Sequence, residues 1–172
     1  MPDTTIIKLT APTLTGLTAA TVHTDSQLNA LTTATVAATT SAPLTLDAVL
    51  ATHLTATINN ADYDGLIAEA HQLPATSNAD RYQFVLRPWL WWLTLASNNR
   101  VFQNLSAQEI VEKVFKDAGF TDYKFQLKTK PAKREYRLQY NESDFNFVSR
   151  LLEQEGIFWF FTHTAGKHTL VL

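Results

Sequence analysis

The sequence contains no cysteine, few glycines and little charge. The absence of cysteine among the 172 residues excludes a disulfide scaffold, a thiolate zinc site and a cysteine nucleophile. Charged residues make up only 17% and the formal net charge is −2, which argues against a protein whose affinity depends on neutralising many phosphates. The length and the 45% of hydrophobic residues are those of one globular domain or two small ones.

The sequence also lacks targeting and membrane signals. The first residues carry an acid, Asp3, and no apolar stretch follows them, unlike a secretory signal peptide. The densest apolar stretch covers residues 89–96, less than half of the ~20 residues that a membrane-spanning helix needs. We therefore expect no signal peptide and no direct membrane anchor.

No motif of a familiar enzyme class occurs in the chain. There is no G-x-S-x-G nucleophile elbow, no Walker loop and no G-x-G-x-x-G. The acids at 142–144 fit the start of a helix, and those at 153–155 fit its solvated face, rather than the facing carboxylates of a glycosidase. The sequence thus predicts no catalytic residues and no cofactor.

Two groups of residues could supply metal ligands. Residues 60–65 resemble the opening of an EF-hand calcium loop, but His71 occupies the position of the bidentate glutamate and the flanks resemble strands. A hairpin turn with Asx caps is the better interpretation. His163 and His168 bracket a hairpin tip that could bring both rings to one ion, but the sequence offers no third ligand nearby. We therefore predict exposed turn histidines and no metal site.

The first half of the chain is rich in Thr, Ala and Leu and predicts short strands, because branched Thr side chains favour strands. A turn of helix is predicted at 47–50, capped by Asp47 or Thr45. The predicted strands cover residues 6–9, 15–23, 31–39, 53–58, 66–72 and 81–88. Successive strands separated by turns suggest a barrel or a sandwich. We divide the chain into a Thr-rich portion at 1–80, taken as the first barrel, and, at 81–172, a portion with helices and the start of a second barrel.

Helical signals appear in the second half of the chain. Ser106 and Glu109 form a capping box, and Gly119 supplies a left-handed stop. The apolar stripe of this helix comprises Ile110, Val111, Val114, Phe115 and Ala118. A second helix is predicted from Ser143 to Gly156.

The two helices align with each other at a constant offset. The alignment places Arg100, Asn104, Ser106 and Gly119 on Arg137, Asn141, Ser143 and Gly156. A strand with arginine leads into each helix and an apolar strand leads out, which suggests two β-α-β units. A chance match between two capped amphipathic helices that end in glycine explains the alignment equally well.

A basic run precedes the second helix. It consists of Lys124, Lys128, Lys130, Lys133, Arg134 and Arg137. With neighbouring aromatics, such a run could bind single-stranded nucleic acid. Lys124, Lys128 and Lys130 are separated by even numbers of residues, so in an extended segment they lie on the same face. We interpret them instead as the solvent-exposed face of an edge strand, and expect no nucleic-acid partner.

The stretch around residue 90 is more specific than these general patterns. A tryptophan-rich strand brings three tryptophans into four positions, a large apolar mass that must lie in a core or a subunit contact. The signature residues are Arg87, Pro88, Trp89, Trp91, Trp92, Phe102 and Asn104, together with the helix caps Ser106, Glu109, Gly119, Ser143 and Gly156. Residues 82–172 resemble the VgrG family, the spike proteins of bacterial type VI secretion, which are related to the baseplate hub of contractile-tailed phages.

The resemblance implies an α+β, mainly β fold: barrel-like sheets of the phage tail hub type with inserted amphipathic helices. It also implies a homotrimer in the full-length protein, a ring that docks on the Hcp tube, and contacts with other spike and baseplate components. The OB-fold and β-helix needle of the family are expected to lie outside this chain. Cytoplasmic assembly followed by export through the type VI machine would require no signal peptide.

Several alternatives stay open at this stage. The tryptophan cluster either locks the barrel to the first helix or forms part of the trimer contact. A phage or tailocin baseplate hub is the nearest alternative function, and a peptidoglycan hydrolase module is the alternative from another class. Without the later trimerising segments of the family, we expect this chain alone to be largely monomeric.

Overall fold

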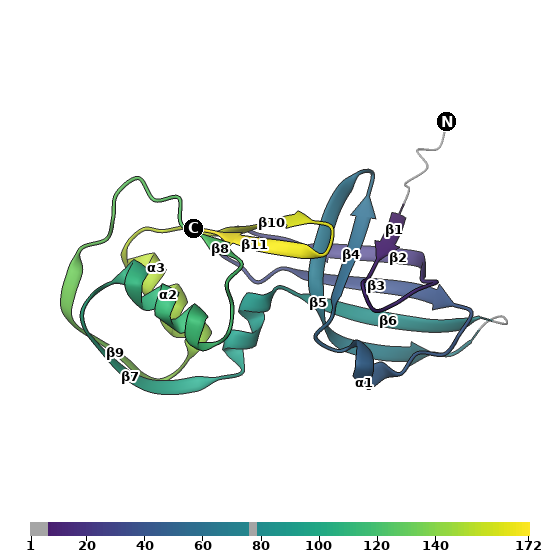
Figure 1. Cartoon of the computed structure of the whole chain (residues 1–172), viewed down its shortest axis with the longest axis horizontal. Helices are drawn as coiled ribbons and strands as arrows, with labels where there is room; N and C mark the ends of the chain where they lie inside the picture. Colours follow the sequence, from purple (N-terminus) through teal and green to yellow (C-terminus); the bar gives the residue numbers. More distant parts are fainter. Residues whose placement is uncertain (1–6, 76–78) are drawn as a thin grey trace. The chain divides into compact units, whose positions relative to one another are not determined.

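The computed structural model describes residues 7–75 and 79–172, which fold into two compact units (Figure 1). The first unit contains the residues up to Pro88 together with Thr162–His168. The second unit contains Trp89–Phe161 and Thr169–Leu172. The sequence-based boundary at residue 80 lies at the start of a strand, Asp80–Arg87, that belongs to the first unit. In the structure the first unit continues to Pro88.

Six strands form the sheet of the first unit. They are β1 (Ile7–Thr10), β2 (Thr18–Asp25), β3 (Thr33–Thr40), β4 (His53–Ile58), β5 (Ala61–Leu73) and β6 (Asp80–Arg87). Their order is β1-β4-β5-β6-β3-β2, and all neighbours pair antiparallel. The end strands β1 and β2 approach each other, so the sheet curls into a nearly closed barrel (Figure 1). This confirms the predicted barrel-like sheet.

The Thr- and Ala-rich strand β3 lies beside the aromatic strand β6. Alternate residues of both strands are buried, and the register places Val36 opposite Phe84 and Ala38 opposite Tyr82. Small side chains on one strand leave room for large rings on the next, as close packing of a core requires. The unusual composition of the first half is therefore what lets this barrel hold its aromatic residues.

The hairpin between β4 and β5 differs from the sequence-based expectation. Its turn consists of Asn59 and Asn60, both with positive φ, as a primed two-residue turn requires. Asp62 and Asp64, expected in the turn, lie in β5 instead. Gly65 also lies in β5, where an added Cβ atom would come within 3.0 Å of the Cβ atom of Leu86. This glycine thus permits the close approach of two strands rather than a turn.

The other elements of the first unit begin and end within a few residues of the prediction. The short helix α1 (Leu46–Val49) follows Thr45, whose side chain makes no capping hydrogen bond. The strand predicted at 6–9 corresponds to β1, although residue 6 lies outside the described residues.

The second unit contains a 3-10 helix, two α-helices and small sheets. In chain order the remaining elements are η1 (Trp89–Thr94), β7 (Ser97–Ser106), α2 (Ala107–Asp117), β8 (Tyr123–Lys124), β9 (Lys133–Ser143), α3 (Asp144–Gln154), β10 (Phe160–Thr164) and β11 (Lys167–Val171). Strands β7 and β9 pair antiparallel, and β11 lies between β10 and β8. Strands β10 and β11 have residues in both units.

The tryptophan-rich stretch is a 3-10 helix and not a strand. Strand β6 ends at Arg87, and Pro88 follows it. Proline has no N–H group to continue the hydrogen-bonded ladder, and the residues after it show no alternation of apolar and polar side chains. The expected strand is therefore wrong for residues 89–94.

The two β-α-β units share backbone details as well as residue types. Asn104 in β7 and Asn141 in β9 both adopt the left-handed conformation, with φ of 54° and 48°. Gly119 and Gly156 follow the two helices with φ of 82° and 68°. A chance match between two capped helices does not require a left-handed asparagine at the same offset in the strand before each. The structure therefore favours a true internal repeat.

Both helices bury one apolar face in the second unit. The buried residues are Ile110, Val111, Val114 and Phe115 on α2, and Phe147, Val148, Leu151 and Leu152 on α3. Ala118, expected in the apolar stripe, is exposed because α2 ends at Asp117 and Ala118 is its C-cap. Phe102 of β7 stacks on Phe147 with ring centroids 5.5 Å apart, which joins the β7–β9 ribbon to α3.

Candidate functional site

Trp89 is the centre of an aromatic cluster in the second unit. It is 3% exposed, stacks on Phe120 at a centroid distance of 4.8 Å and contacts Phe115 of α2 edge-on at 5.0 Å. Its indole N–H donates to the carbonyl oxygen of Asp122 at 3.3 Å. Burial of the ring with its polar atom satisfied fastens η1 to α2 and to the segment that follows α2.

Trp91 and Trp92 are placed differently from Trp89. Both are only half-buried, and their rings meet edge to face with centroids 5.1 Å apart. Thr94, the last residue of η1, donates through its hydroxyl to the carbonyl oxygen of Trp91 at 2.7 Å. The cluster therefore divides into one buried tryptophan that packs on α2 and two that are half-buried.

The other signature residues do not converge on one site. In the first unit, Arg87 donates to the hydroxyl of Thr33 at 2.5 Å, and Pro88 is buried. In the second unit, Phe102 is buried against α3, whereas Asn104 is exposed and left-handed. These positions serve packing and backbone geometry rather than a shared chemical step.

Side chains cap the N-termini of both α2 and α3. The hydroxyl of Ser106 accepts from the N–H of Glu109 at 3.3 Å, and the carboxylate of Glu109 accepts from the N–H of Ser106 at 2.8 Å. Together these bonds form the capping box of α2. The hydroxyl of Ser143 accepts from the N–H of Asn146 at 3.1 Å and caps α3.

A buried polar network around Asp144 was not foreseen. The Asp144 carboxylate accepts from the side-chain amide of Gln139 at 2.7 Å, from Asn98 at 2.9 Å, and from the guanidinium of Arg100. Arg100 also donates to the side-chain oxygen of Gln139 at 2.8 Å. Its members come from β7, β9 and the first turn of α3, so the network ties the β7–β9 ribbon to the start of α3.

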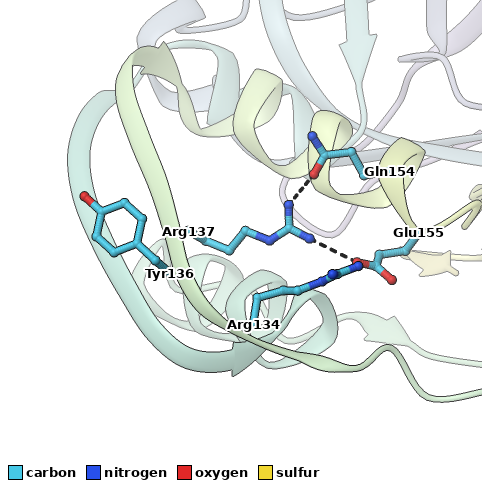
Figure 2. A pocket seen from close by; sticks show the side chains of 5 residues that line it. All are labelled: Arg134, Tyr136, Arg137, Gln154 and Glu155. Atoms are coloured by element: carbon cyan, nitrogen blue, oxygen red, sulfur yellow. Dashed lines mark hydrogen bonds and ion pairs between the residues drawn. The ribbon is translucent and has the colours of Figure 1, made fainter.

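An open depression of about 430 Å³ lies beside the end of α3. Figure 2 shows the side chains that line it. Its lining consists of Arg134, Tyr136, Arg137, Gln154 and Glu155. Arg137 donates to Gln154 and, at 3.1 Å, to Glu155. The side chain of Glu155, expected on the solvated face, is only 14% exposed. The one carboxylate in this lining is ion-paired, so the depression lacks the facing acids that glycoside hydrolysis requires.

The basic run does not form one exposed strand face. Lys124 lies on β8, but Lys128 and Lys130 lie in the segment between β8 and β9. Lys133 contacts Glu109 at 3.2 Å, and Arg137 is ion-paired as described. The edge-strand interpretation is therefore wrong for Lys128 and Lys130. At least two cations of the run have carboxylate partners.

The histidines at the last hairpin are less exposed than expected. His168 is 1% exposed and His163 is half-buried, whereas both were predicted to be exposed turn residues. Burial lowers the pKa of His163 below its usual value. The side chain of His163 stacks on Tyr63 with ring centroids 4.6 Å apart. The correction follows from residues of the first unit that cover the hairpin, which the local sequence does not reveal.

A nearly closed antiparallel barrel, with strand–helix repeats after it, is the architecture of phage tail hub proteins. The prophage MuSo2 43 kDa tail protein of Shewanella oneidensis has this fold, with a TM-score of 0.68 and 16% identity over 96% of this chain and 53% of that one. Residues 25–172 match the family described as phage tail baseplate hub (GPD), and the chain belongs to this family.

Spike proteins of type VI secretion are among the similar proteins. Spike proteins VgrG1b and VgrG1a of Pseudomonas aeruginosa are 44% identical over 110 and 111 residues, 64% of this chain. The E. coli c3393 protein, described as a component of the type VI secretion system, superposes with a TM-score of 0.89 at 26% identity. That superposition covers 95% of this chain and 48% of the other. The expected resemblance to the VgrG family is confirmed.

The chain spans only part of these relatives. The matched region is 15% of the length of VgrG1b and 17% of VgrG1a. The actin cross-linking toxin VgrG1 of Vibrio cholerae is 44% identical over 89 residues, which are 52% of this chain and 8% of the toxin. No helix within the described ranges, 7–75 and 79–172, is long and apolar enough to cross a membrane.

Proposed function

We propose that this chain is the hub portion of a type VI secretion spike. In the full-length protein it forms a homotrimeric ring that docks on the Hcp tube, and it carries out no catalysis. The observation that carries this proposal is the 44% identity to P. aeruginosa spike proteins over 110 residues, in a chain that superposes on c3393 with a TM-score of 0.89. The proposed role depends on shape and on contact surfaces.

The interior of the second unit supports a mechanical role. Trp89 fills the space beside α2, and Asp144 is fixed by donors from β7 and β9. Such buried, fully bonded groups rigidify the elements that carry them. A ring that bears load needs subunits whose strands and helices do not shift relative to each other.

An exposed apolar stripe on the β7–β9 ribbon is a suitable subunit contact for the proposed ring. The stripe consists of Val101, Tyr136, Leu138 and Tyr140, which are 55%, 55%, 41% and 72% exposed. Val101 and Leu138 lie directly opposite each other in the register. Phe102 and Gln139, on the other face of the ribbon, are buried. Exposed aromatic and aliphatic side chains on one face are the composition of an interface core.

The proposed life cycle begins in the cytoplasm and ends with export by the type VI machine. In the ring, a second copy of this chain covers the apolar stripe, and other spike and baseplate components complete the particle. The chain by itself is expected to be largely monomeric. A stable trimer in sedimentation at micromolar concentration would contradict that expectation.

Secretion of Hcp tests the proposed function. We expect that deletion of the gene for this chain abolishes Hcp in the culture supernatant while Hcp in the cell is unchanged, and that a plasmid copy restores it. The test uses a strain in which other spike genes are also removed, and failure of the plasmid copy to restore Hcp secretion there contradicts the proposal. Turnover of peptidoglycan by the purified chain would contradict its non-enzymatic part and favour the hydrolase module.

A phage or tailocin baseplate hub is the second candidate function. The family description and the likeness to a prophage tail protein favour it. Under this alternative, deletion leaves Hcp secretion intact and instead removes tailed particles from induced cultures. The two candidates therefore predict opposite results in one pair of assays.

A further inference from the structure

Three side chains of the first unit meet beside the barrel. His53 begins β4, Asp64 lies in β5, and His168 lies in β11. The Nδ1 atoms of both histidines lie 2.8 Å from the same carboxylate oxygen, Oδ2 of Asp64. The side chains of Asp64 and His168 are 0% and 1% exposed, and that of His53 is 35% exposed. Two imidazoles and one carboxylate thus converge at a place that solvent reaches from one side.

Neighbouring groups hold this carboxylate in position. The hydroxyl of Thr55 donates to Oδ1 of Asp64 at 2.7 Å and itself accepts from the N–H of Gly166 at 2.8 Å. The ring of His163 lies with its Nδ1 atom 3.0 Å from the carbonyl oxygen of Asp64. Protein metal ligands are held in this way by hydrogen bonds to groups around them.

We infer that His53, Asp64 and His168 bind a divalent transition-metal ion, with Zn²⁺ the best match. One ligand atom from each residue lies within 4.8 Å of the others. Imidazole and carboxylate donors suit zinc, whereas Ca²⁺ and Mg²⁺ favour oxygen ligands. With three protein ligands, the fourth position of a tetrahedral ion is left to water.

The ligand atoms, which lie within 4.8 Å of one another, must adjust when the ion enters. Zinc bonds of about 2.0–2.2 Å at tetrahedral angles separate neighbouring donors by about 3.3 Å. The oxygen of Asp64 lies 2.8 Å from each nitrogen, so it retreats by roughly half an ångström when the ion enters.

The ion would connect segments that are distant in the chain. His168 and Asp64 are separated by 104 residues, and His53 and Asp64 by 11. A metal that links the segment Thr162–His168 to the β4–β5 hairpin binds the folded chain and not the unfolded one. It therefore raises the folding stability.

Zinc titration of the whole chain tests this inference. The chain is purified with a tag that contains no histidine and is stripped with EDTA. Calorimetry is expected to give one Zn²⁺ per chain, and thermal unfolding followed by circular dichroism is expected to shift upward by about 5–10 °C when free zinc is about 100 times the dissociation constant. Mg²⁺ at the same concentration is expected to have no effect.

Two substitutions separate this site from other histidines. His53→Gln is the informative variant because His53 is the most exposed of the three ligands, so the fold is expected to survive. His71→Gln is the matched control, since His71 is a surface residue that contacts Glu69. We expect His53→Gln to weaken zinc binding at least about tenfold and His71→Gln to leave it unchanged.

Cobalt provides an independent readout of the coordination. Co²⁺ bound by nitrogen and oxygen donors in a tetrahedral site gives visible absorption bands, which are expected in the wild type and absent in His53→Gln. The inference is overturned if zinc causes no thermal shift in the stripped wild-type chain, or if His53→Gln shifts as much as the wild type. In that case the three side chains form only a hydrogen-bonded cluster.

Discussion

Asp144 combines two stabilising roles in the second unit. It is the first residue of α3, where a negative charge is favoured by the helix dipole. It is also buried, with its carboxylate bonded to Asn98, Arg100 and Gln139. Hydrogen bonds to an ionised group are stronger than those between neutral groups. At the scale of single residues, this carboxylate joins the β7–β9 ribbon to the start of α3.

Substitution Asp144→Asn keeps the shape and removes the charge. We expect the free energy of unfolding to fall by about 2–3 kcal/mol, because Arg100 loses its buried anionic partner and keeps only Asp117, whose carboxylate oxygen lies 3.8 Å away. Urea denaturation followed by tryptophan fluorescence measures this change, since all four tryptophans lie in the second unit. Glu153→Gln, at an exposed position of the same helix, is the control and is expected to change stability by less than about 0.5 kcal/mol. Equal midpoints for Asp144→Asn and wild type would refute the role of the charge.

At the scale of elements, helix α2 shows how much local sequence can determine. Its capping box joins Ser106 and Glu109, three residues apart, so the pattern of the sequence alone predicts it. The 3-10 helix η1 could not be predicted in the same way. Its form depends on Pro88, which ends the ladder of β6, and on the packing of Trp89 against Phe115 of α2.

The capping box makes the stability of α2 depend on pH. Hydrogen bonds from the N–H and hydroxyl of Ser106, and then the nearby Lys133, lower the pKa of Glu109 below its usual value of 4.5. A carboxyl group whose pKa is lowered by folding stabilises the protein above its unfolded pKa, and this contribution is lost as the pH falls through the folded pKa.

Glu109→Gln tests the size of this pH dependence. The variant is expected to be less stable than wild type at pH 7, with the difference shrinking as the pH falls below about 4.5. Urea midpoints measured between pH 7 and pH 3 follow the effect. Lys133→Ala should reproduce only part of it, because the bonds from Ser106 contribute more than the lysine does. A difference in urea midpoint between Glu109→Gln and wild type that stays constant over this pH range would contradict the lowered pKa of Glu109.

At the scale of the whole molecule, prediction from sequence succeeded where interactions are local or repeated. The strand pattern predicted a barrel or a sandwich, which the family resemblance narrowed to a barrel, and the capping residues with the apolar stripes predicted both helices. The residues that were missed are joined by long-range contacts. Arg100 and Asp144 are 44 residues apart, and His168 and Asp64 are 104 apart. Neither partner has a local pattern that points to the other, so only the folded chain shows that they meet.

The proposed ring gives the apolar stripe a role that stability measurements cannot detect. Tyr140 is 72% exposed, so Tyr140→Glu is expected to change the unfolding free energy of the isolated chain by less than about 0.5 kcal/mol. In the ring, the same change places a charge in an apolar subunit contact, and secretion of Hcp by the complemented deletion strain is expected to fall at least about tenfold.

Leu28→Glu is the matched control for this experiment. Leu28 is an exposed apolar residue of the first unit, 60% exposed, and lies outside the stripe, so this variant is expected to secrete Hcp at the wild-type level. Loss of secretion in both variants would indicate a general effect of added charge on an apolar surface. Normal secretion by Tyr140→Glu would remove the stripe from the ring contact while leaving the hub assignment itself intact. If the stripe is a subunit contact, Hcp secretion is lost in Tyr140→Glu and kept in Leu28→Glu, and the melting curve of Tyr140→Glu is unchanged.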